Sequence, residues 1–196
     1  MAQEHSFANP GPAGLGGLAV ACFCFFALLN GYVGHGAGGI LAFWLMGAAV
    51  VQLAAGFIEL KDHNLLGGNL MTFFGAFFCV TGAASFLGKT LYAANGIEVD
   101  ARIDGWAWIA CAVFITVLLP CYLKANKVFF WTVVLADLAV LMIGLIDLKI
   151  GMGFLAPIAG WLLLGVGFGA FANIAAMVIN PTYGKEIVKL GAPYSK

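Results

Sequence analysis

Residues 128–146 read VFFWTVVLADLAVLMIGLI, a run in which Asp137 is the single charged side chain. A helix rises about 1.5 Å per residue, so about 20 apolar residues cross the roughly 30 Å hydrocarbon core of a bilayer. Asn126 and Lys127 precede the run, and Asp147 follows it. This stretch therefore predicts a transmembrane helix with one carboxylate near its middle.

The composition extends this interpretation to the whole chain. Of 196 residues, 63% are hydrophobic and 9% are charged, and the mean hydropathy is +1.01. A soluble domain carries roughly 25% charged residues because its surface faces water. Lipid accepts an apolar surface, so the composition indicates an integral membrane protein whose solvent is the lipid bilayer. The formal net charge of +0 predicts no nucleic-acid partner.

Apolar runs of spanning length recur six times along the chain. They cover residues 13–33, 40–60, 70–87, 106–123, 128–146 and 154–179. The breaks between them are too short for a second domain, so we expect residues 1–196 to form a single six-span domain. The polar N-terminus lacks a basic region and leads straight into the first run, which favours a retained span over a cleaved signal peptide. The sequence thus predicts an all-α membrane protein.

The distribution of basic residues orients the predicted bundle. On the side of the two termini lie Lys61, Lys124, Lys127, Lys185, Lys189 and Lys196. On the opposite side lie Lys89, Arg102 and Lys149. This excess predicts that both termini are cytoplasmic, and an even number of spans agrees with it.

Asp137 is the polar residue that the bilayer tolerates least. A charged carboxylate at the centre of a membrane helix costs on the order of 3 kcal/mol on insertion scales. We therefore expect Asp137 to face the interior of the bundle and to carry a proton. Two roles remain open, a proton-coupling or pore-lining group, and a neutral acid that only joins neighbouring helices.

Five further polar side chains of the spans are candidates for the interior. They are Asn30, Gln52, Glu59, Thr72 and Asn173. Each has two interpretations, a hydrogen bond between helices or a contact to a ligand. The cysteines and histidines show no metal-binding spacing, and no nucleophile–base pair is visible. We therefore expect no metal, no cofactor and no enzymatic activity.

The stretch at residues 9–15, NPGPAGL, leads into the first span. A residue before proline is pushed away from helical geometry, and Pro12 suits the first position of a helix. The following N–H groups, from Ala13 onward, lack helical partners and attract anions. The stretch predicts either an anion-attracting mouth or a rigid cap that fixes the angle of the first helix.

Two motifs resemble those of the acetate/succinate transporter family, called SatP in bacteria and also known as the YaaH-like or AceTr family. Its signature N-P-x-P-x-G-L is matched by Asn9, Pro10, Pro12, Gly14 and Leu15. Its second block, G-G-x-x-Q-x-x-x-G-x-x-E, is similar to residues 48–59, which keep Gln52, Gly56 and Glu59. The resemblance extends over essentially the whole chain.

The resemblance implies a six-helix protomer with its own central pore, assembled as a homo-oligomer, specifically a hexamer. It also implies the plasma (inner) membrane of a prokaryote. The hydrophobic constriction of the family, a Phe, a Tyr and a Leu, falls here on Leu18, Phe74 and Ala136. These replacements remove a hydroxyl and widen one side of the expected gate, and Asp137 stands beside it where the family commonly has a neutral residue.

The leading hypothesis is transport of small carboxylates, acetate and possibly also succinate, by a channel-like or proton-coupled route. One alternative is a channel for another small solute such as ammonia, with Asp137 attracting the cationic form. A second alternative is a membrane scaffold or sensor that transports nothing. Uptake into liposomes and its pH dependence separate the three.

Overall fold

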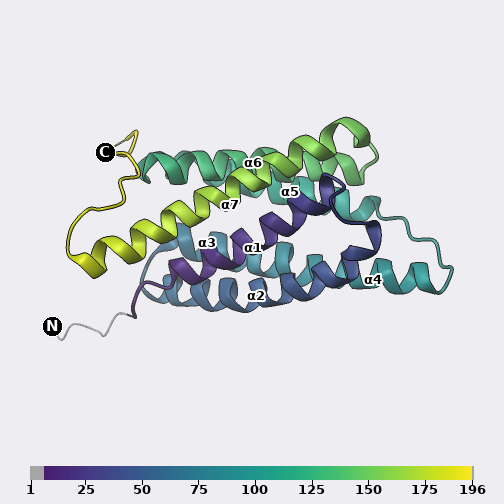
Figure 1. Cartoon of the computed structure of the whole chain (residues 1–196), viewed down its shortest axis with the longest axis horizontal. Helices are drawn as coiled ribbons and strands as arrows, with labels where there is room; N and C mark the ends of the chain where they lie inside the picture. The colour runs from purple at the N-terminus through teal and green to yellow at the C-terminus, as the bar shows by residue number, and fades with distance from the viewer. Residues whose placement is uncertain (1–6, 196) are drawn as a thin grey trace.

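In the computed structural model, which describes residues 7–195, every regular element is helical (Figure 1). The elements are α1 (Gly11–Leu29), η1 (His35–Ala37), α2 (Gly38–Lys61), α3 (Leu65–Phe74), η2 (Gly75–Thr81), α4 (Gly82–Ala94), α5 (Arg102–Leu118), η3 (Leu119–Lys124), α6 (Lys127–Asp147) and α7 (Met152–Tyr183). Six helical stretches are long and apolar enough to cross a membrane. The predicted all-α membrane fold with six spans is confirmed.

The spans surround a common axis. Each span packs against its neighbours in the sequence, and α7 packs against α1, which brings the first and last spans together. The third and fourth spans are the exception, because α4 and α5 make few contacts with each other. The ring of helices therefore has a seam between α4 and α5.

The third span is built from α3, the π-helical segment η2 and α4. The hydroxyl of Thr81 donates to the carbonyl of Ala76, five residues earlier, at 3.2 Å. A π turn holds more residues than an α turn, and such segments are frequent at functional sites. Within η2, the side chain of Phe78 is buried, whereas that of Phe77 is exposed.

The helix ends differ from the predicted boundaries in two informative places. α1 ends at Leu29 because Gly31 has a φ of 72° and the N–H of Tyr32 bonds to the carbonyl of Ala27 at 3.0 Å. The third span continues to Ala94, well beyond the predicted residue 87. Residues 89–94 read KTLYAA, and the lysine, leucine and alanines among them favour a helix, so the helix continues beyond the predicted apolar run.

α5 and α6 cross closely because glycines face each other. A Cβ atom on Gly105 would lie 2.8 Å from the carbonyl oxygen of Gly144, and one on Gly144 would lie 3.1 Å from the backbone nitrogen of Ile109. Small residues of this kind let membrane helices approach at backbone distance.

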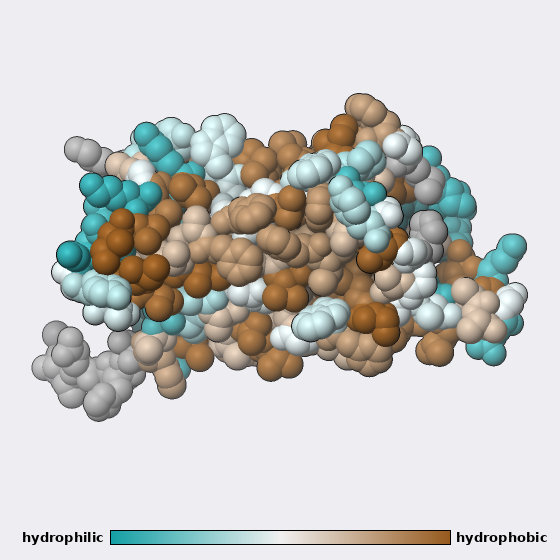
Figure 2. All heavy atoms as spheres, viewed as in Figure 1, coloured by the Kyte–Doolittle hydropathy of each residue, from teal (hydrophilic) through white to brown (hydrophobic). Residues whose placement is uncertain are grey.

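On the face shown in Figure 2, hydrophobic residues dominate the middle of the bundle, and hydrophilic residues gather toward both ends. Side chains such as Val50, Val117 and Phe168 are exposed. The start of α1 and the C-terminal segment lie at the same end (Figure 1), where the N–H of Val128 bonds to the carbonyl of Leu190 at 3.2 Å. The chain is thus a multi-pass membrane protein with both described ends on one side.

Candidate functional site

One face of α6 lines the interior of the bundle along the whole span. Its residues are Phe129, Thr132, Val133, Ala136, Val140, Ile143, Ile146 and Asp147. Their spacing of three or four positions is that of a single helical face. The first five border a cavity toward the end that holds the chain termini, called here the inner cavity. The last three border a cavity toward the opposite end, called here the outer cavity.

The inner cavity has a volume of about 80 Å³ and is bordered by all six spans. Six of the predicted site residues border it, namely Gly14, Leu15, Leu18, Gln52, Phe74 and Ala136. The three residues expected at the constriction thus surround one small space, although they come from α1, α3 and α6. The wall is mostly apolar, and its polar side chains are Gln52, Tyr122 and Thr132.

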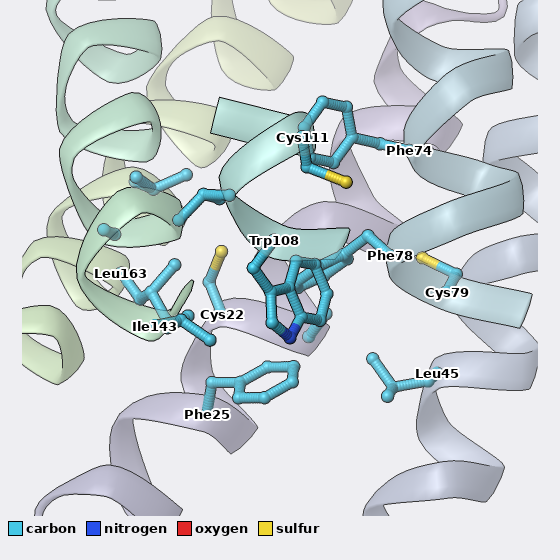
Figure 3. Close-up of a cluster of buried hydrophobic side chains, with 14 of the residues drawn as sticks. Cys22, Phe25, Leu45, Phe74, Phe78, Cys79, Trp108, Cys111, Ile143 and Leu163 are labelled. Atoms are coloured by element: carbon cyan, nitrogen blue, oxygen red, sulfur yellow. The ribbon is translucent and has the colours of Figure 1, made fainter. Parts of the chain in front are cut away.

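The buried aromatic side chains of Phe25, Phe78 and Trp108 gather in the interior of the bundle (Figure 3). The ring of Phe78 packs 5.3 Å from that of Phe25 and 5.6 Å from that of Trp108. Phe78 borders the inner cavity, whereas Phe25 and Trp108 border the outer one. These three rings thus form one contact cluster between the linings of the two cavities.

The outer cavity is larger, about 1050 Å³, and carries the charged side chains. Lys89 of α4 pairs with Asp104 of α5, with 2.6 Å between the ammonium nitrogen and one carboxylate oxygen. The hydroxyl of Ser85 donates to the same oxygen at 2.5 Å. This cluster bridges the seam between α4 and α5. Asp147 of α6 completes the charged lining within the described residues, which therefore holds one cation and two carboxylates.

A second ion pair lies at the same end but outside the outer cavity. Asp100 and Arg102 are exposed, with 2.6 Å between the guanidinium and the carboxylate. Hydrogen bonds from the Arg102 side chain lower the pKa of the Asp100 carboxyl to about 2. Asp100 and Arg102 pair with each other and do not border the outer cavity, so among the described residues Lys89, paired with Asp104, is the cation of its lining.

Asp137 does not lie where the sequence predicted. It borders neither cavity, and its carboxylate accepts a hydrogen bond from the exposed Thr116 of α5 at 2.8 Å. The expectation that Asp137 faces the interior of the bundle is therefore wrong. The reason is geometric, since Ala136 takes the interior position and the next residue is turned about 100° around the helix.

The start of α1 corresponds to the second of the two predicted alternatives, a rigid cap rather than an anion-attracting mouth. The N–H of Gly11 bonds to the side-chain oxygen of Asn9 at 2.8 Å. The N–H groups of Ala13 and Gly14 bond to the carbonyl of Pro10 at 3.1 and 3.3 Å. The groups from Ala13 onward are therefore not free to attract an anion, and residues 9–15 form a self-capped helix start. Asn9, Pro10 and Pro12 do not border the inner cavity.

Glu59 occupies the space next to this helix start. Its carboxylate accepts a hydrogen bond from the side chain of Asn64, and its side chain is 8% exposed. A Cβ atom on Gly11 would lie 3.4 Å from one of its oxygens. Glu59 thus links α2 to the loop before α3, next to the beginning of α1. It borders neither cavity.

The other predicted polar residues make local or interhelical hydrogen bonds. The side chain of Asn30 donates to the carbonyl of Phe26 at 3.0 Å, and that of Thr72 donates to the carbonyl of Gly68 at 2.8 Å. Asn173 accepts a hydrogen bond from Asn126 at 2.9 Å, which joins α7 to the start of α6. None of the three residues borders either cavity.

Sequence reasoning missed several residues of the site. They are Phe25, Phe78, Lys89, Asp104, Trp108 and Tyr122. The aromatic residues resemble any other residue of an apolar run, so only the fold selects them. Lys89 and Asp104 carried a signal, because they lie next to the ends of the predicted third and fourth spans, residues 70–87 and 106–123.

Comparisons with known proteins identify a matching family and two similar proteins. The GPR1/FUN34/yaaH family matches the chain over residues 1–188. Acetate permease A of Emericella nidulans is 27% identical over 154 residues, which is 72% of this chain and 50% of that protein. Ammonia transport outward protein 2 of Saccharomyces cerevisiae is 28% identical over 185 residues, 89% of this chain and 64% of that protein. The chain thus spans half to two thirds of these relatives.

A solved structure has the same fold. The bacterial acetate channel SatP superposes with a TM-score of 0.81 at 21% sequence identity, and the match covers 94% of this chain and 99% of that one. The six-span arrangement is therefore shared over nearly the full length of both chains.

Proposed function

Because this chain belongs to the GPR1/FUN34/yaaH family, we propose that it transports short carboxylates such as acetate along the axis through its two cavities. The observation that carries the proposal is the position of both cavities along one continuous face of α6, with walls supplied by the surrounding spans. The relatives are described as a permease and an outward transporter, and the structural neighbour as a channel, none of them an enzyme.

The chemistry of the two cavities suits weak binding and passage of an anion. In the outer cavity, Lys89 attracts a carboxylate, while Asp104 and Asp147 prevent tight retention. The aromatic cluster around Phe78 excludes water and closes the axis at rest. In the inner cavity, Gln52 offers a neutral polar group rather than a cation, which favours release over tight binding.

Uptake of labelled acetate into proteoliposomes tests the proposal, with and without an inward proton gradient. We expect uptake above that of empty liposomes. A rate that follows the proton gradient favours coupling, and a rate that follows only the acetate gradient favours a channel. Correctly inserted protein without uptake would reject carboxylate transport and leave a scaffold or sensor. Labelled succinate, tested in parallel, measures whether dicarboxylates are accepted.

Export of ammonium is the second candidate. Two observations favour it, the relative described as an ammonia transport outward protein and the excess of carboxylates over Lys89 in the outer cavity. Labelled methylammonium distinguishes the two solutes. Flux of methylammonium without flux of acetate would replace the leading proposal with this one.

We also propose that the chain works as a homo-oligomer, a hexamer by family resemblance, in the plasma membrane. The pair of Asp137 and Thr116 supports this, because a carboxylate in the middle of a span is costly against lipid and less costly against a neighbouring subunit. Native mass spectrometry of the protein in detergent gives the number of subunits. A monomer under conditions that preserve acetate uptake would contradict the proposal.

A further inference from the structure

Tyr122 carries a buried hydroxyl group without a partner. Its side chain is 1% exposed and borders the inner cavity. Among the described residues, its hydroxyl is the one buried side-chain oxygen or nitrogen that makes no hydrogen bond. Buried hydroxyls are normally paired, because an unpaired one loses its hydration without compensation. The group therefore requires a partner that the folded chain does not supply.

The ring of Tyr122 is held firmly in place. It lies in η3, two residues after Pro120, where the fourth span tightens before the turn into α6. The ring packs edge-on against Phe129, with centroids 5.3 Å apart and planes at 75°. Because the ring is fixed by this packing, its hydroxyl is also fixed, and it cannot turn to solvent for a partner.

Glu59 is the buried carboxylate among the described residues, at 8% exposure. The carboxylate of Glu59 is held by Asn64, and it makes no hydrogen bond to Tyr122. The partner of the hydroxyl must therefore come from the cavity itself.

We propose that the Tyr122 hydroxyl donates a hydrogen bond to the carboxylate of a short monocarboxylic acid in the inner cavity, an inference that rests on the proposed function. A phenolic O–H is a good donor to an anion, and hydrogen bonds to charged groups are stronger than neutral ones. A cavity of about 80 Å³ admits a solute of only a few heavy atoms. The small apolar tail of such an acid fits against Leu18 and Phe74.

Gln52 borders the same cavity and supplies a second donor. Its amide oxygen accepts a hydrogen bond from the thiol of Cys79 at 3.3 Å. Its amide N–H groups can therefore donate to the second oxygen of the bound carboxylate. The remaining wall is dominated by apolar side chains. A dicarboxylate would place its other charge against them without a partner, and that is unfavourable. The site therefore selects monocarboxylates over dicarboxylates.

The substitution Tyr122→Phe removes one oxygen atom and leaves the ring in place. If the hydroxyl holds the substrate, the KM for acetate rises about tenfold, as expected for one hydrogen bond to a charged group, with a smaller change in kcat. The unfolding temperature without acetate stays equal or rises, because no bond within the described chain is lost. The matched control is Tyr92→Phe, an exposed tyrosine of α4, which should behave as the wild type.

A binding measurement with purified protein in detergent completes the test. We expect acetate, but not succinate at equal concentration, to raise the unfolding temperature of the wild type, and we expect Tyr122→Phe to lose most of this shift. Wild-type protein that neither transports acetate nor is stabilised by it would contradict the proposed function itself.

The inference alone fails if the wild type transports acetate while Tyr122→Phe keeps the wild-type KM and stabilisation, because the hydroxyl then contacts only water. It also fails if Tyr122→Phe does not fold, because the hydroxyl then has a structural partner. Equal stabilisation by succinate would overturn the selectivity for monocarboxylates.

Discussion

The rings of Phe78 and Trp108 meet edge to face, with centroids 5.6 Å apart and planes at 69°, at the boundary between the two cavities. Phe78 comes from the π-helical segment η2, and Trp108 comes from α5 across the weakly packed seam. Both side chains are buried, at 2% and 9% exposure. This contact and that of Phe78 with Phe25 join the linings of the two cavities, and we propose that they form the barrier to solute movement.

The first prediction concerns the size of this barrier. Phe78→Leu removes the ring contacts with Phe25 and Trp108 but keeps an apolar side chain. We expect faster acetate uptake and admission of longer acids such as butyrate, measured as initial rates in proteoliposomes. The control is Phe43→Leu on the exposed face of α2. Equal rates in both variants and the wild type would show that the ring does not limit passage.

The second prediction concerns the cation of the outer cavity. Lys89→Gln keeps a donor for Asp104 but removes the positive charge, so the external KM for acetate should rise about threefold to tenfold. Lys149→Gln removes an exposed charge at the same end and should change little. The same Lys89 variant should accelerate methylammonium if ammonium is the true solute, so the sign of the effect separates the two functions.

The third prediction concerns Asp137. Because its side chain pairs with Thr116 away from both cavities, Asp137→Asn should leave acetate uptake and its dependence on external pH near those of the wild type. The amide still accepts the hydrogen bond from Thr116. Uptake that no longer responds to pH in this variant would instead establish Asp137 as the proton-coupling group.

The fourth prediction concerns the crossing of α5 and α6. Gly105→Ala places a Cβ atom 2.8 Å from the carbonyl oxygen of Gly144, and overpacking of this kind costs about 1–3 kcal/mol. We expect a lower unfolding temperature in detergent. Gly47→Ala is the matched control, because a Cβ atom there meets nothing within 4 Å, and it should be neutral or slightly stabilising. Equal unfolding temperatures would contradict the close packing.

The number of spans and the fold class follow from the sequence because lipid imposes a simple rule. Each run of about 20 apolar residues must form a helix, since no other backbone structure satisfies its polar groups in lipid without a closed barrel. The sequence motifs of the family also led to Leu18, Phe74 and Ala136, which the structure places around one cavity.

The orientation of each helix about its own axis does not follow from the sequence. The helices are apolar on all sides, so no amphipathic pattern shows which face points inward. Asp137 was therefore assigned to the interior only because a carboxylate facing lipid costs free energy. In the structure Ala136, the preceding residue on the helix, borders the cavity instead. The aromatic cluster and Tyr122 could not be recognised either, because their roles arise from contacts between distant spans.

The central claim is that the solute passes through the inner cavity, and blocking this cavity tests it most directly. Ala136→Phe fills part of the space, whereas Leu138→Phe enlarges a side chain that is 43% exposed on the same helix. We predict that initial acetate uptake falls to about a tenth or less of the wild-type rate in Ala136→Phe and is retained in Leu138→Phe. Undiminished uptake in a well-folded Ala136→Phe variant would contradict the account.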